Sequence, residues 1–465
     1  MSQHSRTGNK NPREIRLNAF HMNTPSHSWA GLWRHPRDRS VEFTSPDYWV
    51  DLAQTAERGL LDGVFLADVI GAYDVYGGNR DAAIRTGAQA PSNDPFAVVP
   101  IMAQATQHIG FGITATLTYE QPYPFARRFS TLDHLTRGRV GWNIVTGYLK
   151  SGASGMGHNG LRAHDERYAA GDDFLEAAYK LWEGSWEDGA LVQDRTNGIF
   201  ADPARVHTVK HDGPYYQLEA AHLSAPSPQR TPVLYQAGSS ARGRQFAARH
   251  AECIFLNGQT KPIVREAVEA IRQQAVAYDR HADDIVIFLG ATVIVAPTTA
   301  EAQELHAEYA RHIDPVGQLA LISGWSGIDF SKYDLDDPIR HEKSNSIQSF
   351  VDNNTIRAEK PVTVRDLISF NHIGGRGPFL VGNPSQVAQG LLDWADETGV
   401  DGFNLVRLVA HESLTAIVDL LVPELQARGR YKTAYRTGAL REKLFAGNGP
   451  HLPARHPGAA YRRGQ

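Results

Sequence analysis

Small and hydroxyl-bearing residues stand between two apolar segments in the stretch 231–258. Val233–Tyr235 reads as a buried strand and Arg242–His250 as a short helix, so Gly238, Ser239 and Ser240 form the turn between them. Two serine hydroxyls and the free N–H groups at a helix start can bind an anion such as a phosphate. The same serines could instead serve only as a helix cap. The pattern therefore predicts either an anion site or a cap.

Polar side chains also follow the other expected strands, but few of them are acids or bases. The sequence contains neither the paired carboxylates of a glycosidase nor a defensible Ser-His-Asp order. It has 20 histidines but no HExxH motif, so we expect no catalytic metal. Chemistry at such a site is most simply supplied by a bound cofactor. The strand-end residues are His21, Asn23, Asp68, Thr114, Thr116, Asn143, Thr146, Asn257, Asn404 and Arg407.

Apolar strand patterns alternate with helical patterns along the whole chain, which is typical of a parallel sheet with both faces covered. Eight such units fit a closed (β/α)₈ TIM barrel of the α/β class better than an open sheet. The expected strands are Ile15–Phe20, Leu61–Ala67, Ile109–Thr116, Arg139–Thr146, Val233–Tyr235, Cys253–Leu256, Ile285–Ala296 and Asp401–Leu408. The expected helices are Tyr48–Arg58, Pro95–Gln107, Pro124–Leu135, Asp165–Trp182, Arg242–His250, Lys261–Tyr278 and one that starts at Pro384.

The chain is longer than a plain barrel requires. A TIM barrel takes about 250 residues, and the sequence has 465. We expect one barrel domain with long insertions at about 147–230 and 297–384, a polar tail at 1–14 and a carboxyl-terminal extension at 430–465. Gly155–Gly160 matches the GxGxxG pattern literally, but it does not directly join a strand to a helix, so we interpret it as a flexible loop.

Composition excludes several classes of partner. The net charge of −4 predicts neither a nucleic-acid surface nor a polybasic membrane patch. No apolar run approaches the roughly 20 residues of a membrane span, and the polar amino terminus does not resemble a signal peptide, so we expect a cytoplasmic protein. The single cysteine, Cys253, lies in an apolar strand and is predicted to be a buried, inert thiol.

Several long motifs together resemble the bacterial-luciferase-like flavin monooxygenases. They are NAFHMNTPSHSWAGLWRHP, AERGLLDGVFLAD, STLDHLTRGRVGWNIVTG, HDERYAAGDDFLEAAYKLWEGSW and PVLYQAGSSARGRQFAARHAE. The similarity runs from about Ile15 to Tyr461 and is strongest to the branch that oxidises nitrilotriacetate, dibenzothiophene sulfone and dimethylsulfide. The resemblance implies a TIM barrel that takes reduced FMN from a separate NADH-dependent flavin reductase and reacts it with O₂. We also expect a homo-oligomer, a dimer or a tetramer.

The resemblance further assigns roles to individual residues. Ala67 and Asp68 would flank the flavin ring, and Thr114 and Asn143 would hold the flavin edge at which O₂ reacts. The implied catalytic residues are Asn143, Thr114 and His21, and the remaining cofactor-binding residues are Thr146, Tyr168, Gly238, Ser239 and Ser240.

The expected substrate side is aromatic and mostly neutral. Such a surface favours a small, weakly polar thioether or sulfone over a polycarboxylate, which would need several converging arginines. The alternatives are a monooxygenase for an aminopolycarboxylate or another xenobiotic, a flavin-binding protein without oxygenase activity, and a deazaflavin-dependent hydride-transfer enzyme. The candidate substrate residues are Phe20, His27, Trp33, Tyr73, Trp325 and His372.

Overall fold

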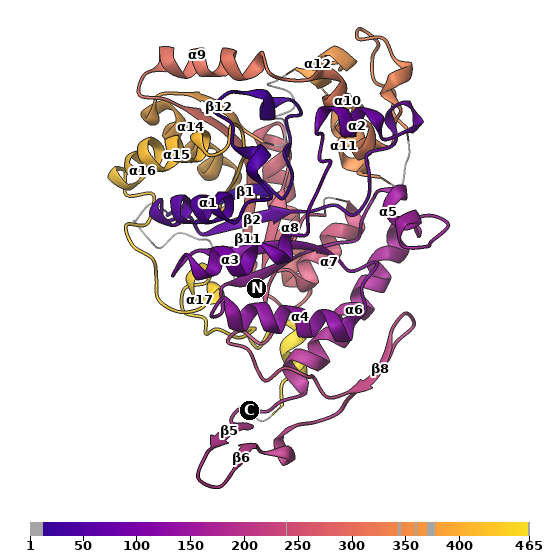
Figure 1. Cartoon of the computed structure of the whole chain (residues 1–465), viewed down its shortest axis with the longest axis vertical. Coiled ribbons are helices and arrows are strands. Elements are labelled where there is room, and N and C mark those ends of the chain that lie inside the picture. Colours follow the sequence, from indigo (N-terminus) through magenta and orange to yellow (C-terminus); the bar gives the residue numbers. More distant parts are fainter. Residues whose placement is uncertain (1–12, 239, 343–345, 359, 370–376, 464–465) are drawn as a thin grey trace, which may run out of the picture.

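The computed structural model describes residues 13–238, 240–342, 346–358, 360–369 and 377–463. Its centre is a closed barrel of eight parallel strands, because the first strand pairs with both the second and the last. This confirms the predicted (β/α)₈ fold (Figure 1). The barrel strands are β1 (Arg16–Met22), β2 (Gly63–Ala67), β3 (Gly110–Thr116), β4 (Val140–Val145), β9 (Val233–Gln236), β10 (Cys253–Leu256), β11 (Val286–Val295) and β13 (Gly402–Val406).

Helices cover the outside of the barrel with their apolar faces. In α1 (Pro46–Arg58), Trp49, Leu52, Ala53 and Ala56 are buried, at the spacing of one helix face. The other covering helices are α3 (Val99–Gln104), α4 (Pro122–Leu135), α6 (His164–Gly184), α7 (Ala241–His250), α8 (Lys261–Ala277), α14 (Pro384–Thr398), α15 (Glu412–Ala416) and α16 (Val422–Ala427).

One predicted helix is shorter than expected. In place of a continuous helix over Pro95–Gln107, the structure has a 3₁₀ turn at Pro95–Ala97 and then α3. Pro100 has no N–H to donate to the preceding turn, so a new helix starts beside it.

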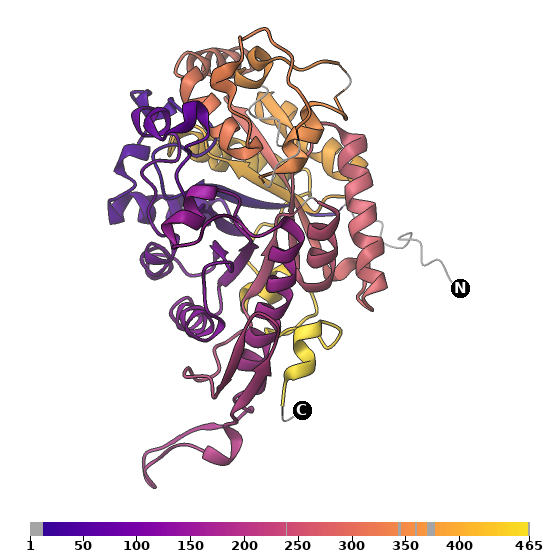
Figure 2. The same cartoon turned by 90° about the vertical axis from the view of Figure 1, so that its right-hand side faces the viewer.

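The first insertion contains part of the barrel itself. Its long helix α6 packs against α4 and α7, and a short helix, α5 (Lys150–Gly155), precedes it. Gly155–Gly160 comprises the end of α5 followed by turn and bend residues, so it is not a strand-to-helix junction. Two hairpins follow α6, and the first of them projects from the bottom of the molecule in both views (Figure 2). They are formed by β5 (Leu191–Asp194) with β6 (Ile199–Ala201), and by β7 (Val209–Asp212) with β8 (Gln217–Ala220).

The second insertion lies at the opposite, upper end of the molecule in both views. It contains α9 (Thr299–Ala310), α10 (Pro315–Ser326), α11 (Gln348–Asn354), α12 (Val364–Ile368) and β12 (Phe379–Gly382). The strand β11 connects it to the barrel, because the first part of β11 pairs with barrel strands and the part from Thr292 pairs with β12. The helix α10 also packs against α2 (Asp81–Thr86), which follows β2.

The carboxyl-terminal extension packs against the amino ends of the strands. The Lys432 ammonium lies 2.8 Å from the Asp62 carboxylate, just before β2. On α17 (Leu440–Leu444), the buried Arg441 guanidinium donates to Glu252, which precedes β10, at 2.6 Å. This end of the barrel is therefore closed by paired charges.

Candidate functional site

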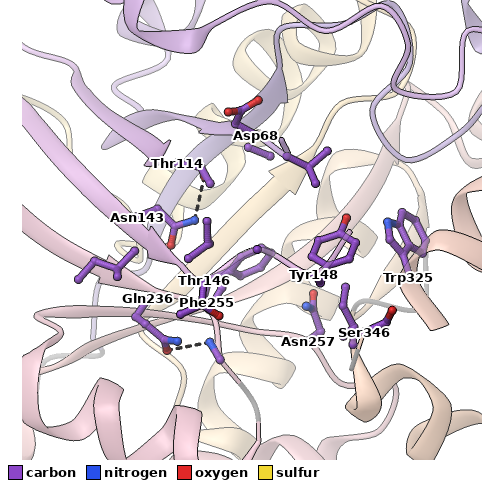
Figure 3. Close-up of a pocket in the computed structure, with 18 of the residues that line it drawn as sticks. Asp68, Thr114, Asn143, Thr146, Tyr148, Gln236, Phe255, Asn257, Trp325 and Ser346 are labelled. Carbon is purple, nitrogen blue, oxygen red and sulfur yellow. Dashed lines mark hydrogen bonds between the residues drawn. The ribbon is translucent and has the colours of Figure 1, made fainter. Parts of the chain in front are cut away.

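A cavity of about 270 Å³ opens at the carboxyl ends of the barrel strands (Figure 3). This is the end at which the sequence predicted a site. The structure brings most of the predicted residues together around it. Those that line the cavity are Phe20, His27, Ala67, Asp68, Tyr73, Thr114, Asn143, Thr146, Tyr168, Gly238, Ser240 and Trp325.

Two predicted residues lie elsewhere. Successive side chains of a strand point to opposite faces, so Phe20 and Met22 point into the cavity and His21 does not line it. Burial is the main reason that the pKa of His21 lies well below its ordinary value, and the positive charge of Arg407 adds to the effect. The indole of Trp33 donates to the carbonyl oxygen of Thr86, outside the cavity. His21 and Trp33 therefore do not line this cavity, while Ser239 and His372 fall outside the described residues.

The floor of the cavity is aromatic. Phe20 of β1 contacts Phe65 of β2 and Phe255 of β10, with ring centroids 5.6 and 5.0 Å apart and edge-to-face geometry. The ring of His27 packs edge-on against Phe20 at 4.4 Å. Such a floor keeps water away from the buried end of a ligand.

Thr114 of β3 and Asn143 of β4 lie directly opposite each other in the pairing of these two parallel strands. The Asn143 side-chain amide donates to the Thr114 hydroxyl at 2.8 Å (Figure 3). That bond fixes the orientation of the amide and leaves its oxygen, Oδ1, buried with no hydrogen-bond partner among the described residues. A buried carbonyl oxygen in this position is suited to accept a hydrogen bond from a ligand N–H.

The glycine-serine turn lies at the end of β9, as predicted. Ser240 caps α7, since its hydroxyl accepts the Gly243 N–H at 3.0 Å. The same hydroxyl also lines the cavity and lies 3.2 Å from Nε2 of His164. A Cβ at Gly238 would lie 2.4 Å from Nε2 of Gln236 and 2.6 Å from the Tyr168 hydroxyl, so a larger residue would displace these side chains from the cavity wall. The two interpretations of the turn, a cap and an anion site, are thus compatible.

The sequence reasoning missed two residues on the helix that faces this turn. His164 and Arg167 line the cavity together with the predicted Tyr168, all from the first turn and a half of α6. Burial lowers the pKa of the Arg167 guanidinium, but an arginine remains protonated at neutral pH. Their spacing of three and four residues puts these side chains on one face of a helix, and this signal could have identified them.

Asp68 is the acidic side chain of the cavity wall. Burial, with a smaller contribution from the nearby charge of Asp94, raises the pKa of its carboxyl to about 7, against an opposing hydrogen bond from Val69. The group is therefore half protonated near neutral pH. Within the described residues it takes part in no ion pair.

The wall opposite the strands is formed by insertions and loops. Tyr148, Asn257, Trp325 and Ser346 are grouped on the side away from Thr114 and Asn143 (Figure 3). Tyr73 and Gln89, from the segment after β2, complete this wall. The described residues contain no group of three or more His, Cys, Asp or Glu side chains that could hold a metal ion.

The sequence profile of the family described as luciferase-like monooxygenase matches residues 19–402. The chain belongs to this family. It is thus a flavin-dependent monooxygenase with the (β/α)₈ barrel described above.

Individual relatives of this luciferase-like monooxygenase cover almost its full length. It is 46% identical to the dimethyl-sulfide monooxygenase of Hyphomicrobium sulfonivorans, over 97% of this chain and 94% of the relative. It is 44% identical to the long-chain alkane monooxygenase of Geobacillus thermodenitrificans, over 97% of this chain and 98% of the relative. The crystal structure of DmoA from Hyphomicrobium sulfonivorans superposes with a TM-score of 0.91, covering 97% of this chain and 96% of that one.

The cavity of this luciferase-like monooxygenase has features that fit a flavin carrying a phosphate. The turn at Gly238 and Ser240 faces His164 and Arg167, which suits a phosphate. The Asn143 oxygen lacks a partner in the described part of the chain and suits a ring N–H. A crystal structure of a riboflavin lyase with modified FMN and riboflavin is 38% identical, with a TM-score of 0.91, and covers 97% of this chain and 100% of that one.

Proposed function

We propose that this chain is the oxygenase of a two-component system that oxidises a small organosulfur compound, with a thioether as the favoured substrate. In this proposal it binds reduced FMN delivered by a separate NADH-dependent flavin reductase and uses O₂ as co-substrate. The observation that carries the proposal is one cavity that joins an anion-binding turn, the oriented Asn143 amide and an uncharged aromatic wall.

Each part of the cavity has a separate task in this proposal. His164, Arg167 and the turn at Ser240 hold the FMN phosphate, whose negative charge pairs with the arginine. Thr114 orients Asn143, and Asn143 accepts a hydrogen bond from the flavin ring. Reduced flavin, when bound, supplies the electrons that activate O₂. The phenylalanine floor excludes water, which would divert the activated oxygen.

The substrate proposal rests on the neutral character of the wall around Tyr73, Tyr148 and Trp325. Among the described residues that line the cavity, the arginine is Arg167, at the end with the glycine-serine turn, so a polycarboxylate would meet aromatic rings of the described residues at the other end. An alkane is the second candidate, because the floor of Phe20, Phe65 and Phe255 suits an alkyl chain equally well. The relatives named for dimethyl sulfide and for long-chain alkanes are consistent with both.

The test is a substrate panel with the purified chain, a flavin reductase, NADH and FMN. Products from dialkyl sulfides, dialkyl sulfones, alkanes and aminopolycarboxylates are identified by mass, and ¹⁸O₂ reports the source of the added oxygen. We expect ¹⁸O in the product of a dialkyl sulfide. NADH consumption that yields only hydrogen peroxide with every compound would contradict an oxygenase. Turnover without O₂ would indicate hydride transfer instead.

Assembly and location remain predictions. No helix in the described part of the chain is long and apolar enough to cross a membrane, and we keep the cytoplasmic location as a proposal. We also expect a homo-oligomer, a dimer or a tetramer. Phe200 in the projecting β5–β6 hairpin is 68% exposed and offers an apolar contact for a second copy. Light scattering of the purified chain measures its mass in solution.

A further inference from the structure

Four cavity-wall side chains form one hydrogen-bonded group, which we call the tyrosine network: Tyr73, Gln89, Tyr148 and Trp325. Tyr73 and Gln89 follow β2, Tyr148 follows β4, and Trp325 lies on α10 of the second insertion. Tyr73, Gln89 and Trp325 are all at least 93% buried, with exposures of 1%, 7% and 6%. The network therefore connects two barrel loops to the insertion.

The chemistry of the side chains fixes the direction of the hydrogen bonds that join Gln89, Tyr148 and Trp325 to the Tyr73 hydroxyl. The Gln89 amide nitrogen donates to the His27 carbonyl oxygen, so Oε1 of Gln89 must point toward Tyr73. An amide oxygen only accepts, so the Tyr73 hydroxyl donates its proton to Gln89, at 2.8 Å. An indole N–H only donates, so Trp325 donates to the Tyr73 oxygen, at 3.1 Å.

Those two assignments decide the remaining contact. The Tyr148 and Tyr73 oxygens lie 2.6 Å apart, and either could be the donor if the pair is viewed alone. The only proton of the Tyr73 hydroxyl is already committed to Gln89, so Tyr148 must donate to Tyr73. The Tyr148 oxygen can then only accept. The backbone of Gln89 has φ 52°, an uncommon value for a residue with a side chain, which is consistent with its being held by these bonds.

We infer that the tyrosine network is the specificity-determining part of the substrate pocket and that it selects substrates without acceptor oxygens. The inference rests on the proposed function and narrows its substrate class to a thioether or an alkyl chain. Within the network, the Trp325 indole N–H, the two tyrosine hydroxyl protons and one amide proton of Gln89 are donated to one another or to the His27 carbonyl oxygen. A sulfoxide, sulfone or carboxylate oxygen would lose its bonds to water against this wall without replacing them.

A thioether or an alkyl group suffers no such loss, because it has no strong acceptor to desolvate. Asn257 is exposed and Ser346 is half-buried, and the amide of one and the hydroxyl of the other can donate to a ligand, but neither belongs to the tyrosine network as defined. The same selection acts against the product. When an oxygen atom is added to the substrate, the product gains an acceptor that the network cannot satisfy, which favours release.

The experiment compares the full chain with the variants Tyr73→Phe, Tyr148→Phe and Tyr333→Phe. Tyr333 is a matched control, since it loses the same hydroxyl in the second insertion but does not line the cavity. Ligands are one dialkyl sulfide, its sulfoxide and its sulfone, together with the alcohol of the same carbon skeleton. The readout is the dissociation constant from ligand-dependent shifts of the unfolding temperature with oxidised FMN present, which requires no turnover.

For the unaltered chain and Tyr333→Phe, we expect the sulfide to bind about tenfold tighter than the sulfone, the low end of the cost of an unsatisfied buried acceptor. Tyr73→Phe releases the Trp325 and Tyr148 donors, so the preference for the sulfide should fall to about twofold or less. Tyr148→Phe should keep the preference and weaken the alcohol alone, because it removes the acceptor. Equal binding of sulfide and sulfone by the unaltered chain, or an unchanged preference in Tyr73→Phe, overturns the inference.

The same measurements separate this inference from the proposed function. One outcome is that no sulfide is oxidised in the product assay while the binding preference and its loss in Tyr73→Phe are observed. That result supports the selective role of the tyrosine network and contradicts the proposed reaction. If sulfides are oxidised and the binding preference is absent, the proposed reaction is supported and the tyrosine network does not determine substrate specificity.

Discussion

The two ends of the barrel are closed by different chemistry. At the amino ends of the strands, charges are buried in pairs, such as Arg441 with Glu252 and Lys432 with Asp62. At the carboxyl ends, a cavity is lined mostly by neutral amides, hydroxyls and aromatic rings, with Arg167 near the glycine-serine turn, and Asp68 takes part in no ion pair within the described residues. Paired charges stabilise the amino end of the barrel, whereas hydrogen-bond donors and acceptors at the carboxyl end can bind ligands. We therefore expect substitutions at the two ends to affect different measurements.

The largest expected effect is on stability, at the amino end. Arg441→Met leaves Glu252 as a buried charge without its partner and should cost about 3–5 kcal/mol of unfolding free energy. Chemical denaturation measures this loss. Arg441→Met combined with Glu252→Met should recover most of it, because no unpaired charge remains. FMN affinity of the folded fraction should be unchanged. A large change in that affinity would contradict the separation of stability at the amino end from ligand binding at the carboxyl end.

The next effect is on chemistry, at the carboxyl end. Asn143→Ala removes the oriented amide oxygen and should lower product formed per NADH consumed by about tenfold to a hundredfold, within the range for loss of one preorganised polar group. The unfolding free energy should change by about 1 kcal/mol or less, since a single neutral hydrogen bond is lost. Thr114→Val is the partner variant, which removes the bond that orients Asn143. If Asn143→Ala forms as much product per NADH consumed as the unaltered chain, Asn143 has no role in the reaction.

A comparable effect, on FMN binding rather than on product formation, should appear at the turn that both caps α7 and lines the cavity. Ser240→Ala should weaken FMN binding by about 1.5–3 kcal/mol, the value of a hydrogen bond to a charged group, and cost about 1 kcal/mol of stability as a lost cap. Thr298→Ala is the control, because Thr298 caps α9 in the same way outside the cavity. Titration of flavin fluorescence gives the affinity. Equal FMN affinity in both variants would mean that Ser240 is a cap only.

The smallest effect depends on pH. The pKa of Asp68 is raised to about 7, so its carboxyl is neutral below that pH and negative above it. We expect FMN binding to weaken modestly from pH 6 to 8, because the new negative charge repels the phosphate. The folded state holds this proton at a pH where the unfolded chain has lost it, so the group lowers stability as pH rises from about 4 to 7. Asp68→Asn should flatten the pH dependence of both FMN affinity and stability. If the variant keeps the pH profiles of the unaltered chain, Asp68 is not the group that titrates.

Sequence patterns predicted the barrel because each of its strands is a short apolar run bounded by polar residues. The register of β3 and β4 then follows from barrel closure, and it places Thr114 beside Asn143. The failures have physical causes. His21 is polar and close to a strand end, but the alternation of side chains turns it away from the cavity. Loop positions such as Gln89 depend on contacts with distant segments, here with His27, which no local spacing encodes.

The interpretation of Tyr73 and Trp325 illustrates the same limit. Both are candidate substrate residues from the sequence and both line the cavity, yet their bond to each other joins residues 252 positions apart. A local pattern marks an aromatic residue as a candidate, but only the folded chain shows which atom donates. The spacing of His164, Arg167 and Tyr168, by contrast, was readable and was overlooked.

The extension of β11 beyond the barrel has a consequence for how such an enzyme can diversify. The second insertion pairs with the part of β11 from Thr292, while the earlier part of the strand pairs only with barrel strands. Mutations that reshape α10 around Trp325 can therefore accumulate without altering the pairing that closes the barrel. The substrate-facing wall formed by α10 can therefore change during evolution, and with it the substrate, while the barrel strands stay constant.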